Sequence, residues 1–244
     1  MKHPPDWRLY LVTDRGLARG RPIAWVVEAA VRGGATAVQL REKNCGTRDF
    51  VQLGRELKHL LAPLEVPLIV NDRVDIALEI GADGVHIGQQ DMDYEGARRL
   101  LGPGAIIGLS IETIEQARAA VRLDVDYLGV GPVFATATKM DAAPPLGVAA
   151  LAEICAISRH RVVAIGGIGL ENAREAIDSG ADGVAIVSAI CAAEDPERTA
   201  RELRQMIDGG LAGTSHRLAE EARSQANRGG AMAPFCESRK IMVS

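Results

Sequence analysis

The feature that most constrains the fold is a regular alternation between short apolar runs and segments whose apolar residues recur at helical spacing. The runs that predict strands are RLYLVT (8–13), TAVQLRE (36–42), PLIVND (67–72), DGVHIG (83–88), AIIGLS (105–110), DYLGVGP (126–132), RVVAIGG (161–167) and DGVAIVS (182–188). Segments such as 22–34, 48–62 and 171–180 predict the intervening helices. Eight such units in 244 residues favour an α/β fold that closes into a (β/α)8 TIM barrel over an open parallel sheet.

A weak internal repeat supports the closed barrel. GGATAV, GADGVHIG and GADGVAIVS each place glycine after a helix and before a new strand. Glycine there allows the left-handed residue that ends a helix. An open doubly wound sheet would often carry a G-x-G-x-x-G turn after its first strand, and VTDRGLARG lacks that spacing.

The pattern weakens near the C-terminus, from about Gly209. We therefore expect a catalytic barrel over 1–208 and a flexible extension over 209–244, which is rich in Gly, Ala, Ser and Arg. One helix is expected within it, over 215–226. A packed accessory element is the alternative for this extension.

The overall composition argues against two classes of partner, nucleic acids and membranes. A net charge of −4 and 3% aromatic residues argue against a basic or base-stacking surface for nucleic acid. No apolar run has the length of a membrane span, the N-terminus does not resemble a signal peptide, and the four cysteines form no metal or redox motif. These features predict a cytoplasmic protein with small-molecule ligands and no nucleic-acid or membrane partner. They leave a homo-oligomer open.

Polar residues gather where the predicted strands end. The carboxyl ends of barrel strands meet at one rim, where barrel enzymes have their sites. Along 37–44, side chains alternate across the strand, so Gln39, Arg41 and Lys43 should face this rim while Leu40 and Glu42 face the opposite way. The other strand ends add Thr13, Asp14, Asn71, Asp72, His86, Gln89, Asp91, Ser110, Thr136, Thr138, Lys139, Gly166, Gly167 and Ser188.

The charged members of this set indicate a diphosphate site. Asp72 and Asp91 offer the hard oxygen ligands that suit Mg²⁺, which completes its shell with phosphate oxygens and water. Arg41, Lys43 and Lys139 supply positive charge that would stabilise a departing anion. The structural alternative is a ring of salt bridges that pairs Arg41 and Lys43 with Asp72 and Asp91.

A second anion site is expected near the seventh and eighth strands. The glycines of AIGGIG, with VAIVSAI, suit a phosphate cup because a ligand can approach glycine backbone closely. The loop GPVFATATKMDAAPPLG is long enough to close over a substrate, although a plain solvated loop is the alternative. His86 lies within a strand, and a hydrogen-bonded core histidine is favoured over a catalytic one.

Seven motifs together resemble the thiamine-phosphate synthase family. They are YLVTD, VQLREK, NDRVDIALEIGADGVHIGQQD, IGLS, YLGVGPVFATATKMDA, VAIGGI and GVAIVSAI, and the resemblance runs in order from Tyr10 to Met206. It implies a transferase that joins 4-amino-2-methyl-5-hydroxymethylpyrimidine diphosphate to a thiazole phosphate, with or without an extra carboxylate on the thiazole. The products would be thiamine phosphate and pyrophosphate, and the pyrophosphate would leave before the thiazole nitrogen attacks.

The resemblance also implies residue roles. The pyrimidine diphosphate would be bound by Gln39, Arg41, Lys43, Asn71, Ser110 and Lys139, of which Arg41, Ser110 and Lys139 would be catalytic. Mg²⁺ would be held by Asp72 and Asp91. The thiazole phosphate would be bound by Thr136, Ala137, Thr138, Gly167, Val187 and Ser188.

Two alternatives and two departures accompany this resemblance. The segment beyond Gly209 is not part of the family pattern. Ala137 stands where the family commonly has Pro or Asn, which bears on the rigidity of the loop. A related thiazole tautomerase shares the barrel but uses a histidine soon after the fifth strand, and GLSIETIEQA contains none. A non-catalytic sensor of a phosphate ligand is the other alternative, which loss of a metal carboxylate would have favoured.

Overall fold

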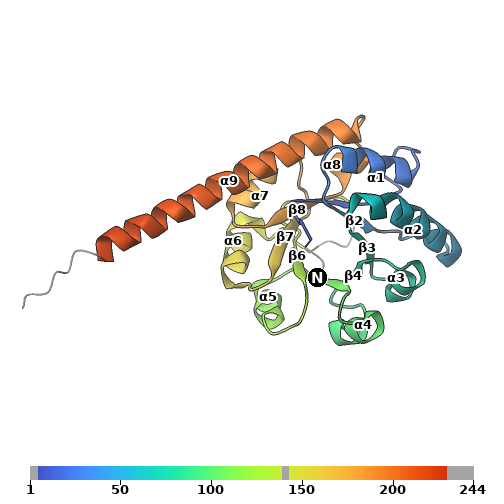
Figure 1. The fold of residues 1–244 in the computed structure, drawn as a ribbon, viewed down its shortest axis with the longest axis horizontal. Coiled ribbons are helices and arrows are strands. Elements are labelled where there is room, and N and C mark those ends of the chain that lie inside the picture. Colours follow the sequence, from blue (N-terminus) through green and yellow to red (C-terminus); the bar gives the residue numbers. More distant parts are fainter. Residues whose placement is uncertain (1–4, 139–142, 230–244) are drawn as a thin grey trace, which may run out of the picture.

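The computed structural model describes residues 5–138 and 143–229. The burial of side chains is described up to residue 212. Eight parallel strands form a closed barrel in sequence order, and the last strand pairs with the first (Figure 1). The strands are β1 (Leu9–Val12), β2 (Ala37–Leu40), β3 (Leu68–Asn71), β4 (Gly84–Ile87), β5 (Ile106–Ile111), β6 (Tyr127–Val130), β7 (Arg161–Ile165) and β8 (Gly183–Ile186). Each lies within a predicted run or extends it by a single residue, so the (β/α)8 barrel is confirmed.

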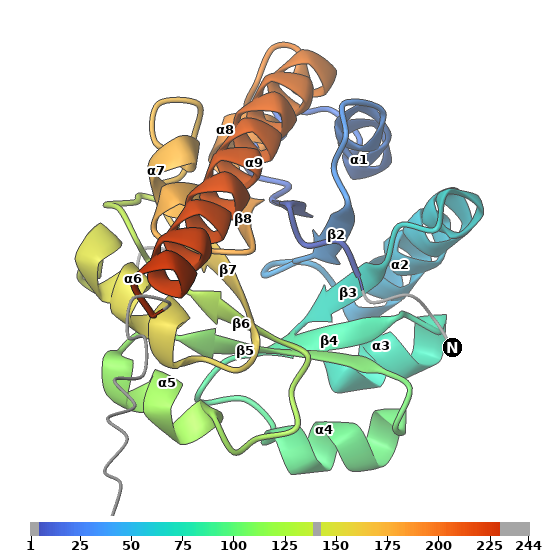
Figure 2. The ribbon, with the colours of Figure 1, turned by 60° about the vertical axis from the view of Figure 1, so that its left-hand side comes forward.

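Helices follow the strands and surround the barrel (Figure 2). They are α1 (Ile23–Arg32), α2 (Thr47–Leu61), α3 (Val74–Ile80), α4 (Tyr94–Leu101), α5 (Ile114–Ala120), α6 (Gly147–Ile157), α7 (Ala173–Asp178), α8 (Ser188–Cys191) and α9 (Pro196–Gly229), with a short 3₁₀ turn η1 (Ala62–Leu64) after α2. Among the described residues, no helix is both long and apolar enough to cross a membrane.

Strand alternation divides the apolar residues into two layers. On β1, Leu9 and Leu11 belong to the large cluster that packs between the strands and the helices, while Tyr10 and Val12 belong to a smaller cluster within the barrel. This division follows from the two-residue period of a strand, which sends neighbouring side chains to opposite faces. The smaller cluster forms the floor beneath the carboxyl-terminal rim.

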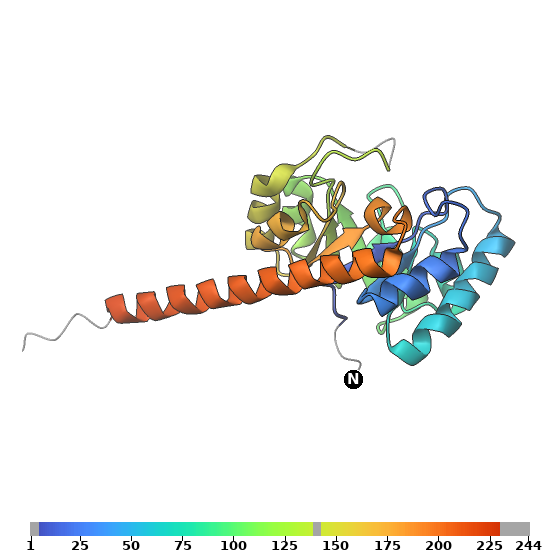
Figure 3. The same ribbon diagram turned by 90° about the horizontal axis from the view of Figure 1, so that it is seen from above.

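Helix α9 passes through the predicted boundary at 208/209 without a break. Its first part packs against α1, α7 and α8, and buries Ala200, Leu203 and Ile207. Gly210 also lies close to α7, where an added Cβ would come within 2.8 Å of the Ile177 side chain. Figure 3 shows the helix running along the barrel and continuing beyond it. The division into a barrel and a flexible extension stays a prediction.

Candidate active site

One cavity of about 520 Å³ opens at the carboxyl-terminal end of the barrel. The predicted site residues that line it are Gln39, Arg41, Lys43, Asn71, Asp72, Asp91, Ser110, Thr136, Thr138, Gly167, Val187 and Ser188. The side chain of Ala137 is exposed beside the two threonines. Lys139 lies outside the described residues. The strand ends therefore bring both predicted halves of the site to one space.

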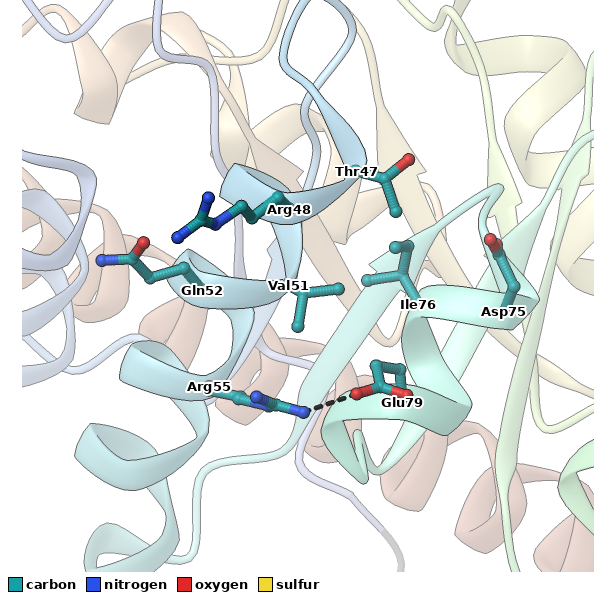
Figure 4. A pocket seen from close by; sticks show the side chains of 8 residues that line it. All are labelled: Thr47, Arg48, Val51, Gln52, Arg55, Asp75, Ile76 and Glu79. Carbon is teal, nitrogen blue, oxygen red and sulfur yellow. Dashed lines mark hydrogen bonds and ion pairs between the residues drawn. The ribbon is translucent and has the colours of Figure 1, made fainter.

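A second groove lies on the outside of the barrel, between α2 and α3 (Figure 4). Arg55 and Glu79 form an ion pair across it. The residues that line this groove are Thr47, Arg48, Val51, Gln52, Arg55, Asp75, Ile76 and Glu79, none of which was predicted for the site. The described residues that were predicted for the site line the barrel cavity instead, with the exception of Ala137.

The strand that carries the cations has the predicted alternation. Gln39 is buried on the inner side, whereas Val38 and Leu40 pack in the layer between strands and helices. Arg41 and Lys43 continue the inner series at the rim and line the cavity. Two cations from one strand thus reach the same space.

Each of these cations has a carboxylate partner. Lys43 Nζ lies 2.8 Å from an oxygen of Asp72, as the salt-bridge alternative proposed. Arg41 Nη1 instead lies 3.3 Å from an oxygen of Asp14, and its backbone N–H donates to the hydroxyl of Thr13. Only one pair of the alternative ring, Lys43 with Asp72, is thus formed among the described residues. The Lys43 side chain is about half exposed, so its ion pair contributes little to stability and can be exchanged for a ligand anion.

Asp72 is placed by a strained turn after β3. Its φ is +60°, which is uncommon for a residue with a Cβ. The Arg73 N–H donates to the Asn71 carbonyl at 2.7 Å, which closes a three-residue turn around Asp72. The Asp72 N–H donates to the carbonyl of His86 on β4. The turn directs the Asp72 carboxylate into the cavity.

Asp91 completes an acidic pair. Burial raises the pKa of this carboxyl, and the nearby negative charge of Asp72 raises it further, while hydrogen bonding from the Gly88 N–H opposes both. That N–H donates to Asp91 Oδ2 at 2.7 Å. A carboxyl whose ionisation is disfavoured by a neighbouring carboxylate forms, with that neighbour, a donor set suited to a hard divalent cation. Within the described residues, three-ligand groups of His, Cys, Asp or Glu are absent, so protein ligands would come from this pair.

Glycine is required at both positions after β7 for a reason that the sequence did not reveal. Gly166 and Gly167 both have positive φ, at +97° and +65°. A Cβ on Gly166 would come within 2.5 Å of Pro132 Cα, and one on Gly167 within 2.4 Å of the Ala135 carbonyl oxygen. The loop after β6 therefore packs directly on these glycines, and a bound ligand is not needed to explain them.

The same loops carry the predicted phosphate-binding groups. The Thr138 N–H donates to the hydroxyl of Thr136, and the side-chain amide of Asn172 donates to the Gly167 carbonyl. Ser188 begins α8 directly after Val187. These groups lie at the β6–β8 side of the cavity, across from the cations and carboxylates of β2–β4.

His86 is a hydrogen-bonded residue of the barrel floor, as its position within a strand predicted. Burial lowers its pKa to about 4, although the negative charge of Asp72 opposes this shift, so the imidazole is neutral near pH 7. Its Nδ1 lies 2.9 Å from the Tyr127 hydroxyl and its Nε2 lies 2.9 Å from the Ser110 hydroxyl. Both ring nitrogens are thus engaged.

Tyr10 and Tyr127 were missed in the sequence. Their hydroxyls lie 2.9 Å apart within the barrel, and both residues line the floor of the cavity. Gly108 and Gly129 were the available signal, because glycine within a strand often marks the close approach of another group. A Cβ on Gly108 would come within 2.1 Å of the Tyr127 ring, and one on Gly129 within 2.7 Å of His86.

The described cysteines lie apart from this chemistry. Cys45, Cys155 and Cys191 are free thiols that do not line the cavity. Burial raises the pKa of Cys155 to about 12 and that of Cys191 to about 11. A thiolate nucleophile is therefore disfavoured at these two positions. Cys236 lies outside the described residues.

Proteins of known family resemble this chain in sequence and in fold. The family model described as thiamine monophosphate synthase matches residues 9–190. A thiamine-phosphate synthase from Albidiferax ferrireducens is 55% identical over 201 residues, which cover 82% of this chain and 92% of the relative. One from Chloroflexus aurantiacus is 52% identical over 205 residues, covering 84% and 94%.

A solved structure gives the same result. The thiamine phosphate pyrophosphorylase from Pyrococcus furiosus superposes with a TM-score of 0.79 at 40% identity, covering 85% of this chain and 98% of that chain. The resemblance inferred from the motifs is thus confirmed by sequence and by fold. The chain belongs to the thiamine monophosphate synthase family.

Proposed function

We propose that this chain, a thiamine-phosphate synthase by family, transfers a pyrimidinylmethyl group in a Mg²⁺-dependent reaction. The donor would be 4-amino-2-methyl-5-hydroxymethylpyrimidine diphosphate, and the acceptor the ring nitrogen of 4-methyl-5-(2-phosphooxyethyl)thiazole or its carboxylated form. The products would be thiamine phosphate and pyrophosphate. The observation that carries the proposal is that one cavity holds charged groups for a diphosphate on one side and backbone and hydroxyl groups for a phosphate on the other.

The diphosphate side suits a leaving anion. Arg41 and Lys43 would contact the phosphate oxygens, and Asn71 and Ser110 would position the pyrimidine end. In the free protein the two cations pair with Asp14 and Asp72, so both already lie at the cavity before the diphosphate binds. Lys139 would add a third cation from the loop after β6.

Mg²⁺ would be held by Asp72 and Asp91. The acidic pair fits such an ion because the negative charge of Asp72 helps to raise the pKa of the Asp91 carboxyl, and a bound cation would offset that repulsion. Bound there, Mg²⁺ supplies positive charge to the diphosphate. Lys43, which already donates to the Asp72 carboxylate, would lie near the diphosphate oxygens as well.

The thiazole phosphate would bind at the opposite side. Thr136 and Thr138 offer hydroxyls, and Gly167, Val187 and Ser188 offer backbone or side-chain donors. This arrangement would hold the two substrates facing one another, with both anions anchored at the ends of the cavity. Holding two reactants in a productive orientation is a large part of such catalysis.

No covalent intermediate with the protein is required. Among the described cavity residues, the polar side chains are cations, carboxylates, amides, hydroxyls and one neutral imidazole. They stabilise charge and orient reactants, which suits departure of pyrophosphate followed by attack of the thiazole nitrogen. The cytoplasmic location inferred from the sequence stays a prediction.

The decisive experiment is to mix both substrates with Mg²⁺ and the full chain and to follow thiamine phosphate and pyrophosphate by chromatography. Equal amounts of both products, and neither product when the pyrimidine substrate or Mg²⁺ is omitted, are expected. Isomerised thiazole without coupling would favour the tautomerase alternative. Binding of either substrate without product would favour the sensor.

Variants test the placement of the site. Arg41→Ala and Asp91→Ala should each lower kcat/KM by at least about a hundredfold, the usual effect of removing an electrostatic contact to the transition state. Arg55→Ala, which removes an arginine from the outer groove, is the matched control and should leave turnover unchanged. Near-normal turnover of either cavity variant would contradict the diphosphate assignment.

A further inference from the structure

A continuous chain of hydrogen bonds crosses the floor of the barrel beneath the cavity. The side-chain amide of Gln39 donates to the Tyr10 hydroxyl at 3.0 Å, and the Tyr10 and Tyr127 hydroxyls lie 2.9 Å apart. The Tyr127 hydroxyl lies 2.9 Å from His86 Nδ1, and His86 Nε2 lies 2.9 Å from Ser110 Oγ. The chain thus joins β2 to β5 through the barrel interior, and the residues at both of its ends line the cavity.

The packing around this chain holds its members in place. Trp7 stacks against Tyr127 with ring centroids 4.1 Å apart. The strand glycines Gly108 and Gly129 leave room for the Tyr127 ring and for His86, respectively. Gln39, Tyr10 and Tyr127 are buried, and His86 is 9% exposed. Rotation of any one ring would leave buried polar groups without partners, which is costly.

The donor at one end determines the direction of every bond in the chain. A tyrosine hydroxyl has one proton and two acceptor sites, and a buried proton that lacks an acceptor is costly. With two neighbours in the chain, a hydroxyl that accepts from one therefore donates to the other. Tyr10 accepts from Gln39 and therefore donates to Tyr127, which in turn donates to His86 Nδ1. A neutral imidazole whose Nδ1 accepts carries its proton on Nε2, and this N–H donates to Ser110 Oγ.

We propose that His86 is a positioning residue that, as the Nε2–H tautomer, fixes Ser110 as a hydrogen-bond donor toward the ligand. Because Ser110 Oγ already accepts from His86, its own proton is directed to an acceptor in the cavity. The ligand group at this point is then an acceptor atom of the pyrimidine diphosphate, such as a ring nitrogen or a phosphate oxygen. A donor group alone, such as an amine, would leave the Ser110 proton without an acceptor. The identity of this ligand rests on the function proposed above.

Gln39 is the residue that sets this direction. An amide can donate, whereas an ionised carboxylate can only accept. In Gln39→Glu, Tyr10 must donate to residue 39, Tyr127 must donate to Tyr10, and His86 must donate from Nδ1. The same change would convert Ser110 from a donor toward the ligand into a donor toward His86.

The tautomer of His86 is the direct test. In ligand-free full chain labelled with ¹⁵N-histidine, long-range proton–nitrogen spectra distinguish the protonated ring nitrogen from the bare one. The His86 signals are assigned by their loss in His86→Gln. We expect Nε2–H in the unchanged protein and Nδ1–H in Gln39→Glu at alkaline pH, where the glutamate is ionised. An Nδ1–H form in the unchanged protein would overturn the proposal, and an unchanged tautomer in Gln39→Glu would overturn the role of Gln39.

A kinetic measurement tests the consequence for the ligand. Tyr127→Phe keeps the ring but removes the donor to His86 Nδ1, so the Nε2–H form is no longer enforced. We expect KM for the pyrimidine diphosphate to rise by roughly two- to tenfold, the value of one hydrogen bond, with KM for the thiazole phosphate unchanged. Tyr94→Phe, on α4 outside the barrel, is the control. Equal changes in both KM values would indicate general damage and contradict the proposal.

The two experiments separate this inference from the proposed function. The tautomer is read without substrate, so it is determined even if the chain makes no thiamine phosphate. An active synthase with the Nδ1–H form would overturn the inference and leave the function intact. An Nε2–H form in a chain without synthase activity would support the hydrogen-bond chain and contradict the function.

Discussion

At the residue scale, Asp72 combines a strained backbone with a proposed role in metal binding. Its φ of +60° places a Cβ in the left-handed region, which glycine occupies at no steric cost. The strain at this position lowers the stability of the fold, and the same backbone conformation directs the Asp72 carboxylate into the cavity. Gly166 and Gly167 also have positive φ, but glycine adopts this conformation without strain because it lacks a side chain.

Asp72→Gly should separate stability from function. We expect the free energy of unfolding to stay the same or to rise by up to about 1 kcal/mol, because backbone strain and repulsion with Asp91 are both relieved. Synthase activity and Mg²⁺ binding should be lost. Denaturant unfolding and titration calorimetry with Mg²⁺ measure the two effects, and Asp72→Asn, which keeps a Cβ, is the control. A large loss of stability in Asp72→Gly would show that the Lys43–Asp72 pair matters more than the strain.

The pKa of His86 predicts how stability depends on pH. The folded-state pKa is about 4, below the ordinary value of 6.5, so between these values the unfolded chain binds more protons than the folded one. Stability therefore falls as the pH falls through this window. The total loss should be about 3 kcal/mol by pH 4, because each pH unit between the two pKa values contributes roughly 1.4 kcal/mol.

This contribution is measured as a difference between two proteins. Chemical unfolding of the unchanged chain and of His86→Gln should be followed from pH 7 down to pH 4. The stability of the unchanged chain should fall more steeply than that of the variant, whatever the variant's stability at neutral pH. Parallel curves would show that His86 is protonated in the folded protein at the same pH as in the unfolded chain.

At the scale of elements, strand glycines create the space for the barrel floor. Gly108 on β5 faces the Tyr127 ring of β6, so an alanine there would have a Cβ about 2.1 Å from a ring carbon. Backbone pairing between β5 and β6 leaves little freedom for either strand to move apart. The hydrogen-bond chain and the packing of the barrel thus depend on the same glycines.

Gly108→Ala should destabilise the barrel by about 1–3 kcal/mol or more, the usual cost of overpacking a core. Gly104→Ala, in the loop before the same strand, has no atom within 4 Å of the new Cβ and should be nearly neutral. Thermal unfolding of the two variants measures the contrast. An equally small effect in both would mean that Tyr127 can move away, and the hydrogen-bond chain would then be less rigid than inferred.

At the scale of the whole molecule, α9 belongs partly to the barrel and partly to the predicted extension. Its buried residues Ala200, Leu203 and Ile207 precede the predicted boundary, and they pack where α1 and α7 flank the helix (Figure 2). The close packing is also visible at Gly33, where a Cβ would come within 2.3 Å of the Glu197 carbonyl oxygen. The start of α9 therefore closes the helical layer between the last and the first unit.

Two truncations should separate these parts. A chain ending at residue 212 keeps Ala200, Leu203 and Ile207, the buried apolar side chains of the described part of α9, and we expect its stability and synthase activity to match those of the full chain. A chain ending at residue 195 removes three buried apolar side chains and should lose several kcal/mol or fail to fold. Thermal unfolding and the synthase assay measure both. Loss of activity in the longer truncation alone would show that residues 213–244 serve the reaction.

The sequence by itself determined the order of the strands, the rim at which they end and the side to which each residue points. These follow from local periodicity, because strand alternation and helical spacing are encoded by neighbouring residues. Hence Gln39, Arg41 and Lys43 could be assigned to one side, and most of the cavity residues could be collected, from the order of the amino acids alone. The family resemblance rested on the same local motifs.

Only the tertiary structure decided which groups meet. Arg41 pairs with Asp14 and not with Asp72 or Asp91, Gly167 makes room for a loop, and Tyr127 crosses the barrel to His86. Each contact joins residues from different strand–helix units, and its partner is set by barrel closure, register and the shape of the space that remains. Local periodicity specifies which side a residue faces but not its distance from a residue on another strand, and for that reason the hydrogen-bond chain beneath the cavity became visible only in the folded molecule.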